Sequence, residues 1–299
     1  MIEKLVEILG EENVLPLEKL NKHTTFRVGG PSKALLLVNT IEELKTVYGM
    51  LKKAGEEFFV IGNGSNLLVS DEGYEGYVIK LSGEFTDICV EGTKLTAGSG
   101  AILSKVAVAA RENSLTGLEF AHGIPGTVGG AMVMNAGAYD GEMSFVVESV
   151  EMLREDGTLK TYSLEEMEFG YRNSVMKKER LIALKTVFSL KTGNAEEIQA
   201  KMNDFNERRR SKQPLEFPSA GSTFKRPEGA FAGKLIQDSG LAGARVGGAC
   251  VSTKHCGFVI NDQSATASDI DSLMKLIINK VKEDSGFVLE PEVIRIGRF

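Results

Sequence analysis

Residues 117–139 read GLEFAHGIPGTVGGAMVMNAGAY, and this stretch carries most of the information about the fold. Its glycines form three clusters separated by alanine and methionine, and Glu119 is its one acidic residue. A segment with so little charge is not a solvated loop. Because glycine has no side chain, such a backbone can pass very close to a flat apolar ligand. Close packing of a helix on a sheet through small residues is the alternative, and both interpretations stay open on this stretch alone.

A second glycine loop, Gly62-Asn-Gly-Ser-Asn66, lies between two apolar runs. Its glycines allow backbone N–H groups to turn towards an anion, and Ser65 and Asn66 add side-chain donors. The loop lacks the lysine of a P-loop and the GxGxxG spacing of a dinucleotide fingerprint. A tight turn between strands therefore remains the alternative to an anion site.

The composition is that of an ordinary globular chain of 299 residues, with 42% hydrophobic residues, 33 glycines and a net charge of −6. An acidic chain without a basic stripe argues against a nucleic-acid binder. No apolar run approaches the roughly 18 residues of a membrane span, and the acidic N-terminus is unlike a signal peptide. Three cysteines without a CxxC pair are typical of reduced thiols, so we expect a soluble, intracellular protein.

The first part of the chain alternates between strand and helix patterns. Thr40 and Glu43 form a capping box that opens a helix, which favours a small βαβ unit ending at the first glycine loop. Its expected strands are 34–38, 58–61 and 67–69.

From about Tyr77 onward, short apolar runs separated by Gly-Thr or Asp-Gly turns predict a mostly antiparallel sheet. The expected strands are 77–81, 88–91, 95–97, 146–154, 159–162 and 181–190. A helix at 102–112 and the glycine-rich stretch interrupt them.

A charged helix at 195–210, capped by Asn194, leads to a second domain that begins near Pro214. That domain contains a helix at 269–284 with Ser268 as its predicted N-cap, and a terminal strand at 288–296. The three histidines show no metal-ligand spacing, so we expect no metal site, and His122 is interpreted as a structural hydrogen bonder.

Six motifs in this order resemble those of the UDP-N-acetylenolpyruvoylglucosamine reductase family, from about residue 20 to 297. They are His23-Thr-Thr-Phe-Arg27-Val-Gly29-Gly30, the loop 62–66, the stretch 117–139, Gly170-Tyr-Arg172-Asn-Ser174, Pro218-Ser-Ala-Gly-Ser222-Thr-Phe-Lys225 and Leu289-Glu-Pro-Glu292-Val. The short separation of Arg172 and Ser222 is similar to the subtype without an extra substrate-covering insertion.

The resemblance implies an α+β fold, with a vanillyl-alcohol-oxidase-type FAD-binding domain of two α+β subdomains followed by a C-terminal substrate-binding α+β domain. The expected boundaries are 1–80 and 81–212 for the two subdomains and 213–299 for the substrate domain, whose terminal strand returns to the active site. The implied activity is the NADPH-dependent reduction of UDP-N-acetylglucosamine enolpyruvate to UDP-N-acetylmuramate in peptidoglycan precursor synthesis. We expect a cytoplasmic monomer whose partners are small molecules, with neither nucleic acid nor membrane.

The same resemblance implies which residues hold non-covalent FAD. They are Arg27, Gly62, Asn63, Gly64, Ser65, Asn66, Ser99, Gly123, Ile124, Pro125, Gly126, Thr127, Gly130, Asn135, Ala136, Gly137 and Ala138.

Three residues match the family's catalytic positions. Arg172 is expected to hold the substrate carboxylate, because a guanidinium binds both oxygens of a carboxylate. Glu292 is the expected partner of Arg172, either polarising the substrate carboxylate if protonated or relaying a proton. Ser222 resembles the family's proton donor to the carbanionic carbon. Lys212, Lys225, Lys234 and Gln237 are the expected substrate-binding residues.

Two positions depart from the family pattern. Arg226 follows Lys225 where asparagine is usual, and Arg295 lies one place later than the common basic residue. In an alternating strand this shift moves the charge to the other face, so Arg295 is not assigned to the site.

Two other functions remain as alternatives. A flavin-dependent sugar or alcohol oxidase of the same fold would need a base for hydroxyl deprotonation rather than a proton donor to a carbanion. A nucleotide-binding regulator without catalysis belongs to a different class, and flavin absorbance of the pure protein separates it from both enzymes.

Overall fold

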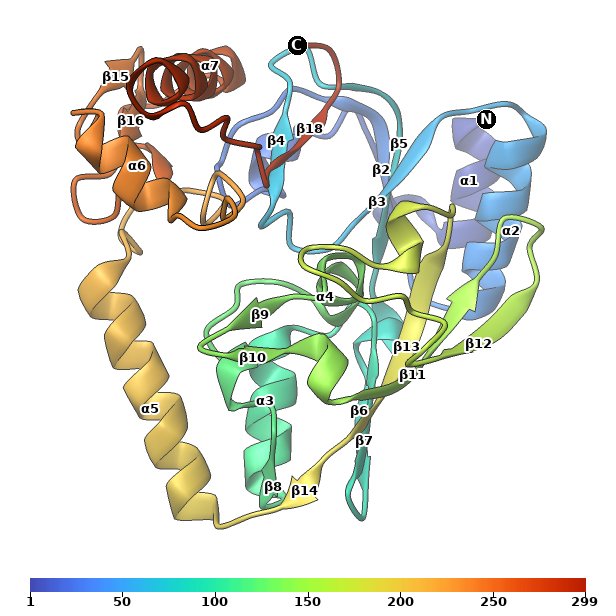
Figure 1. Cartoon of the computed structure of the whole chain (residues 1–299). Helices are drawn as coiled ribbons and strands as arrows, with labels where there is room; N and C mark the ends of the chain where they lie inside the picture. Colours follow the sequence, from blue (N-terminus) through green and yellow to red (C-terminus); the bar gives the residue numbers. More distant parts are fainter. The chain divides into compact units, whose positions relative to one another are not determined.

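The computed structural model describes all residues, 1–299, and they form two compact units (Figure 1). Unit 1 contains residues 1–16, 34–63 and 76–208, and unit 2 contains residues 17–33, 64–75 and 209–299. Both units are therefore assembled from separate pieces of the chain, and each is described by itself.

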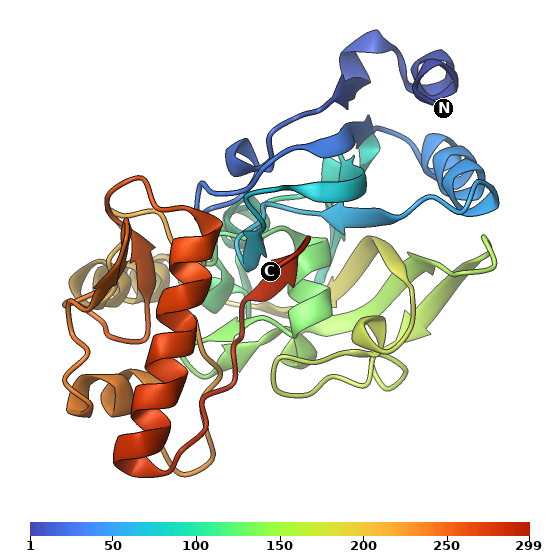
Figure 2. The same ribbon diagram turned by 90° about the horizontal axis from the view of Figure 1, so that it is seen from above.

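One sheet of unit 1 has the strand order β1-β2-β5-β3. Helices α1 (Ile2–Leu9) and α2 (Ile41–Lys53) lie side by side on it (Figures 1 and 2). Their apolar faces share one buried cluster with this sheet, including Leu5, Leu44 and Ile79. The strands are β1 (Val14–Pro16), β2 (Ser32–Val38), β3 (Phe58–Ile61) and β5 (Tyr74–Leu81).

The predicted capping box of α2 is confirmed, since the Thr40 hydroxyl accepts from the Glu43 N–H and the Glu43 carboxylate accepts from the Thr40 N–H. The expected grouping of strands was partly wrong. Strand 77–81 belongs to this sheet, where β5 runs parallel to β3, rather than to the antiparallel sheet. Residues 67–69 do not continue the βαβ unit either. Both errors concern long-range pairing, on which local apolar patterns carry no information.

The second sheet of unit 1 is antiparallel throughout, in the order β12-β11-β13-β7-β6, as the spacing of short strands predicted. Helices α3 (Leu103–Glu112) and α4 (Val128–Met134) share with it a core that includes Val106, Val128 and Phe188. The strands are β6 (Ile88–Glu91), β7 (Lys94–Gly98), β11 (Val147–Leu153), β12 (Leu159–Ser163) and β13 (Ile182–Ser189).

Two small ribbons and all but the last turn of a long helix complete unit 1. The ribbons pair β9 (Gly137–Ala138) with β10 (Gly141–Glu142), and β8 (Leu115–Thr116) with β14 (Lys191–Thr192). Helix α5 (Ala195–Lys212) begins where the Asn194 side chain accepts from two backbone N–H groups, so its predicted cap is confirmed.

Unit 2 is built around α7 (Ala267–Ser285), beside which β15 and β16 are seen in Figure 1. Its core joins the helix to distant segments through residues such as Phe26, Leu68 and Ile270. The other elements are α6 (Ala232–Asp238), β15 (Arg245–Val246), β16 (Ala249–Val251), β17 (Val259–Asn261), β4 (Leu67–Val69) and β18 (Ile294–Ile296).

Two expectations for unit 2 need correction. The N-cap of α7 is Thr266, which forms a capping box with Asp269, and not Ser268. Ser268 instead donates its hydroxyl hydrogen to Asp71. The terminal strand is shorter than expected, because only β18 pairs in a ladder, parallel to β4.

Candidate active site

The loop after β3 lies against the second glycine stretch inside unit 1. A Cβ added to Gly62 would lie 2.3 Å from the Thr127 Oγ1, so no larger residue fits there. The Asn63 side-chain amide donates to the Pro125 carbonyl at 2.7 Å. The structure thus brings together two segments that were predicted separately to hold the cofactor.

The second half of this loop belongs to unit 2. Gly64 has a φ of 60°, and a Cβ on it would lie 2.1 Å from the His23 carbonyl oxygen. The Thr25 N–H donates to the Gly64 carbonyl at 3.4 Å. Arg27, two residues after Thr25, is exposed and has a φ of 57°, a conformation that residues other than glycine rarely adopt. The tight approach to His23 explains why glycine is required at 64.

Ser99 follows β7 and is buried at 3% exposure, yet its hydroxyl has no hydrogen-bond partner within the chain. Its backbone is well held, since its N–H donates to the Leu184 carbonyl and its carbonyl accepts from the Gly129 N–H, both at 2.8 Å. An unsatisfied buried hydroxyl costs about 1–3 kcal/mol. Ser99 therefore carries an unused polar group in the region where a cofactor contact was predicted.

Helix α4 begins in the glycine stretch. The Thr127 hydroxyl accepts from the Gly130 N–H at 3.4 Å and caps the helix. Gly130 is exposed, and a Cβ on it would touch only the Thr127 Oγ1 at 3.6 Å. Gly123 and Ile124 are half-buried, whereas Gly126 is buried. Gly123 and Gly130 thus lie towards the surface of unit 1, whereas Ile124 packs against its core.

Asn135 ends α4 in the left-handed conformation, with its side chain 1% exposed. Its amide donates to the Glu142 carboxylate at 3.1 Å and to the Gly170 carbonyl at 3.2 Å, while its Oδ1 accepts from the Ser144 N–H at 3.0 Å. Within the chain this side chain thus links the glycine stretch to the turn that contains Arg172. The half-buried residues that follow, Ala136, Gly137 and Ala138, have no such side-chain role.

Arg172 lies in a tight turn of unit 1. Gly170 and Asn173 exchange two backbone hydrogen bonds of 3.1 Å across it, and Arg172 has a φ of 53°. The Lys177 ammonium donates to the Arg172 carbonyl at 2.7 Å, and the guanidinium carbon lies 5.1 Å from the centre of the Tyr171 ring. A strained, non-glycine turn held by this many contacts is typical of a functional position.

Ser222 lies in unit 2 on an exposed turn that follows Gly221, whose φ is 74°. The next residue, Thr223, is completely buried. Its N–H donates to the Gly257 carbonyl and its hydroxyl accepts from the Val259 N–H, both at 2.9 Å. The Ser222 side chain is therefore accessible while the backbone beside it is fixed.

Glu292 is held on the neighbouring antiparallel segment of unit 2. Its N–H donates to the Thr223 carbonyl at 2.9 Å, and its own carbonyl accepts from the Asn66 amide at 3.1 Å. The structure thus brings together Ser222 and Glu292, two residues 70 positions apart in the sequence. Thr223, which joins them, was missed by sequence reasoning, since a hydroxyl residue in a turn motif gives no sign that it will be buried.

The loop behind Thr223 contains His255, which is half-buried. Its Nδ1 accepts from the Gly257 N–H at 3.1 Å, and its ring packs edge-on against Phe258. Burial lowers the pKa of His255, which favours the neutral ring that this hydrogen bond requires. His255 therefore supports the backbone to which Thr223 is bound.

The expected substrate residues lie on the surface. Lys212 and Gln237 are exposed, Lys225 pairs with Glu290, and Lys234 pairs with Asp238. Surface ion pairs contribute at most about 1 kcal/mol, so a phosphate can replace the carboxylate at either lysine. None of these four residues is buried in the core of its unit.

The two departures from the family pattern have clear local roles. The Arg226 guanidinium stacks on the exposed Phe231 ring, 4.1 Å from its centre. Arg295 donates to Asp271 of α7 at 2.6 Å, consistent with its exclusion from the site. His122 makes a 2.8 Å hydrogen bond with Asn206 of α5, as expected of a structural hydrogen bonder.

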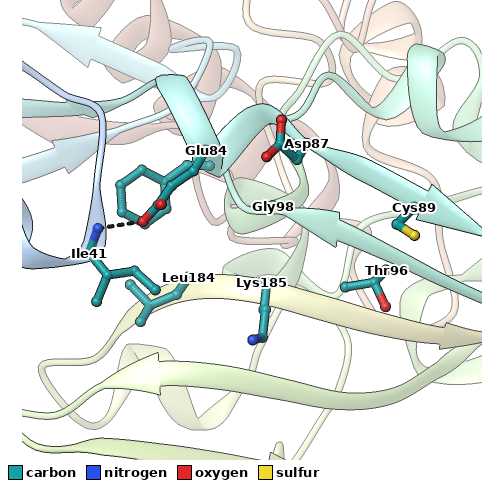
Figure 3. A pocket seen from close by; sticks show the side chains of 9 residues that line it. Ile41, Glu84, Asp87, Cys89, Thr96, Gly98, Leu184 and Lys185 are labelled. Atoms are coloured by element: carbon teal, nitrogen blue, oxygen red, sulfur yellow. Dashed lines mark hydrogen bonds between the residues drawn. The ribbon is translucent and has the colours of Figure 1, made fainter.

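One pocket, with a volume of about 210 Å³, lies in unit 1 over β6, β7 and β13. Figure 3 shows its labelled side chains, including Asp87, Cys89 and Lys185, spread along the strands without converging on a point. The Glu84 carboxylate on its rim accepts from the Ile41 N–H. The pocket contains no predicted site residue.

No group of three or more potential metal ligands gathers in the structure, and none of its helices is long and apolar enough to cross a membrane.

Two family models match the chain. One, described as an FAD binding domain, covers residues 32–163, and the other, the C-terminal domain of UDP-N-acetylenolpyruvoylglucosamine reductase, covers residues 213–296. The matches agree with an FAD-binding fold followed by a C-terminal domain, and the expected boundaries at 80 and 212 stay predictions.

Curated relatives match over nearly the whole chain. The UDP-N-acetylenolpyruvoylglucosamine reductase of Caldanaerobacter subterraneus subsp. tengcongensis is 48% identical over 99% of this chain and 98% of its own length. The protein of the same name from Clostridium botulinum (strain Eklund 17B) is 51% identical over 93% of this chain and 91% of its own length.

Solved structures agree with the fold. The crystal structure of UDP-N-acetylenolpyruvylglucosamine reductase from Thermus caldophilus has a TM-score of 0.83 and 38% identity, covering 95% of this chain and 99% of that one. A glucose dehydrogenase, Phl p 4.0202, shares the fold alone, with a TM-score of 0.50 and 13% identity over 64% of this chain and 44% of its own. The predicted fold class is confirmed. The chain therefore belongs to the UDP-N-acetylenolpyruvoylglucosamine reductase family of FAD-binding enzymes.

Proposed function

We propose that this protein reduces the enolpyruvyl ether of UDP-N-acetylglucosamine to UDP-N-acetylmuramate, with NADPH as the hydride source. The observation that carries the proposal is the exposed Ser222 hydroxyl on a backbone hydrogen-bonded to the segment of Glu292. The reaction adds a hydride to the terminal vinyl carbon and a proton to the carbon beside the carboxylate. A hydroxyl on a fixed backbone, hydrogen-bonded to the segment that carries a carboxyl group, fits the protonation step.

The residues of unit 1 fit FAD. The buried Ser99 hydroxyl lacks a partner within the chain, and no neighbouring side chain crowds the exposed Gly130. Ser99, the loop 62–66 and the segment 123–127 are the residues that we propose to hold the cofactor. Bound FAD supplies the redox chemistry, and the protein supplies orientation and charge.

Three side chains carry the steps that belong to the protein. We assign Arg172 to the substrate carboxylate, where a guanidinium offsets the negative charge that spreads into it as the hydride arrives. Ser222 delivers the proton to the carbon beside the carboxylate. Glu292 orients or polarises that carboxylate. At the surface, Lys212, Lys225, Lys234 and Gln237 are assigned to the nucleotide part of the substrate.

We further propose that the protein works in the cytoplasm as a monomer. A membrane-spanning helix is absent from the structure, and the substrate class is water-soluble. Light scattering at micromolar concentration tests the monomer, for which a molar mass of 32.4 kDa is expected.

The activity is tested in two separate half-reactions without oxygen. NADPH should bleach the flavin absorbance of the wild-type protein, and the enolpyruvyl sugar nucleotide should then restore it. If a sugar or alcohol reduces the flavin and oxygen restores it, the protein is an oxidase. A colourless protein that stays colourless after addition of FAD would rule out both enzymes and favour a nucleotide-binding regulator.

A further inference from the structure

Lys80 of β5 is a half-buried cation without a partner. Neither a hydrogen bond nor an ion pair joins its ammonium group to another residue of the chain, and burial alone lowers its pKa. By contrast, other lysines of unit 1, such as Lys94 and Lys160, pair with carboxylates. Removing a charge from water without compensation is unfavourable. A bound anion from outside the chain would therefore stabilise the Lys80 ammonium group, since the chain itself provides no such partner.

The register of the sheet places Lys80 beside the first glycine loop. Strands β3 and β5 are parallel, and Lys80 pairs with Ile61, the last residue before Gly62. Paired residues on neighbouring strands are about 5 Å apart. Ligands of parallel sheets bind beyond the carboxyl ends of the strands, which is where this lysine lies.

The alternation of β5 gives the face on which Lys80 lies. Tyr77, Ile79 and Leu81 belong to the core shared with α1 and α2. Successive side chains of a strand point to opposite faces, so Lys80 lies on the other face together with Val78. Val78 is 1% exposed, which shows that this face is covered. Lys80 is therefore not on an open, fully solvated surface.

The loop beside Lys80 offers further donors within unit 1. The Asn63 N–H donates to no acceptor in the chain. The Asn63 side chain is held by the Pro125 carbonyl, and Gly62 touches Thr127, so the loop backbone is fixed. A backbone N–H and an ammonium group at one strand end are the elements of a phosphate site.

We propose that Lys80 binds the diphosphate of FAD together with the backbone of the loop at Gly62–Asn63. The proposal rests on FAD being the cofactor, and it adds to the glycine loop a charged residue that the motifs do not contain. The lysine stem covers apolar surface, and the ammonium group compensates phosphate charge. Lys80 acts in binding and takes no part in the reduction.

The experiment compares K80M, K80R and the wild-type full chain, with K53M as the matched control. Lys53 is an exposed lysine near the end of α2 in the same unit. Flavin-free protein is titrated with FAD, ADP and riboflavin, and flavin fluorescence or calorimetry reports binding. K80M should bind FAD and ADP about tenfold to a hundredfold more weakly than the wild type, because a hydrogen bond to a charged group is lost. Riboflavin, which has no phosphate, should bind K80M as it binds the wild type.

Two more readouts separate an anion site from general damage. The affinity of the wild type for FAD should fall more steeply with salt than that of K80M, while K80R and K53M should follow the wild type. Without flavin, K80M should melt at the same temperature as the wild type or higher, because an unpaired half-buried charge is gone. With FAD it should melt lower than the wild type.

Equal affinity of K80M and wild type for FAD and ADP would overturn the proposal and show that the ammonium group simply reaches solvent. If K80M lost as much affinity for riboflavin as for FAD, the proposal would be overturned as well, because the substitution would then have damaged the protein outside the phosphate site. If the wild type binds no FAD, the proposed function fails. The ADP titration then still decides whether Lys80 is part of an anion site.

Discussion

At the scale of single residues, the structure separates side chains that hold the fold from those that remain available for chemistry. Asn135 is conspicuous in the sequence, but its amide is used inside unit 1 by Glu142, Gly170 and Ser144. Ser99, which is buried in the same unit, keeps an unused hydroxyl. In the sequence both residues are polar candidates for contact with the cofactor. Only the structure shows that the Asn135 side chain is hydrogen-bonded within the chain and that the Ser99 hydroxyl is not.

For Ser222, replacement by alanine should leave flavin reduction by NADPH unchanged and slow reoxidation by the substrate by about 10²- to 10⁴-fold. The reason is that only the second half-reaction needs a proton on carbon. Stopped-flow absorbance of each half-reaction measures the two effects. S272A, which removes an exposed hydroxyl from α7, is the control and should behave as the wild type. Near-normal reoxidation in S222A would exclude the proton-donor role.

For Arg172, the backbone and the side chain should respond separately to substitution. Its φ of 53° favours glycine, so R172G should be more stable than R172A by up to about 1 kcal/mol. Both variants should lose turnover by at least about a hundredfold, because neither can hold a carboxylate. Urea unfolding and steady-state turnover give the two quantities. An R172G variant less stable than R172A would show that the turn does not need this conformation.

At the scale of elements, unit 2 is stabilised by contacts between its last helix, α7, and segments distant from it in the sequence. Asp71 accepts from the N–H groups of Ala267 and Ser268 at the start of α7, at 2.7 and 2.9 Å. Arg295 of β18 and Lys275 bind the buried Asp271 on the same helix. Asp71, just after β4, binds the start of α7, and Arg295 of β18 binds Asp271 on the same helix. These contacts fix the positions of β4 and β18 relative to α7 within this unit.

The Asp271 contacts predict a dependence of stability on pH. Burial by itself raises the pKa of Asp271, but hydrogen bonds from Lys275 and Arg295 outweigh it and lower the pKa below its ordinary value. The stabilisation is therefore complete above pH of about 4 and is lost as the pH falls through the lowered pKa. At pH 7, D271N should reduce the free energy of unfolding by about 2 kcal/mol, and the difference from the wild type should shrink below pH 4.

Denaturant unfolding of D271N and wild type between pH 3 and 8 measures this effect. D284N is the matched control, since Asp284 pairs with Lys280 on the exposed side of the same helix, where pairs contribute about 0.3–0.5 kcal/mol. A D271N difference that stays constant down to pH 3 would contradict the assignment.

At the scale of the whole molecule, the chain passes between its two units several times. Residues 17–33 and 64–75 belong to unit 2 although the rest of that unit begins at residue 209. Phe26, Val28 and Leu68 from these pieces are buried in the core around α7. Contacts thus group the N-terminal pieces with the C-terminal domain that a family model places at 213–296.

A fragment of residues 1–212 should therefore fold poorly. Without α7 the side chains of Phe26, Val28 and Leu68 lose their apolar surroundings, and each such loss costs about 1.5–3 kcal/mol. We expect the fragment to bind a hydrophobic dye and to associate in light scattering, whereas the full chain should do neither. A soluble, monomeric fragment with a cooperative thermal transition would show that unit 1 is independent of these segments.

The sequence by itself determined what depends on neighbouring residues and on motif order. The capping box at Thr40, the cap at Asn194 and the individual strands follow local rules, because each involves contacts between nearby residues or a regular alternation. The six ordered motifs were enough to identify the family. They were also enough to propose Arg172, Ser222 and Glu292 as its chemical groups.

Only the tertiary structure decided which distant pieces meet. The pairing of β4 with β18, the contact of Thr223 with Glu292 and the solitary charge of Lys80 depend on residues far apart in the sequence. Long-range contacts arise when separate apolar faces are buried together, and a local pattern does not specify the partner face. Whether a polar side chain is satisfied or left free is therefore known only once the fold has formed.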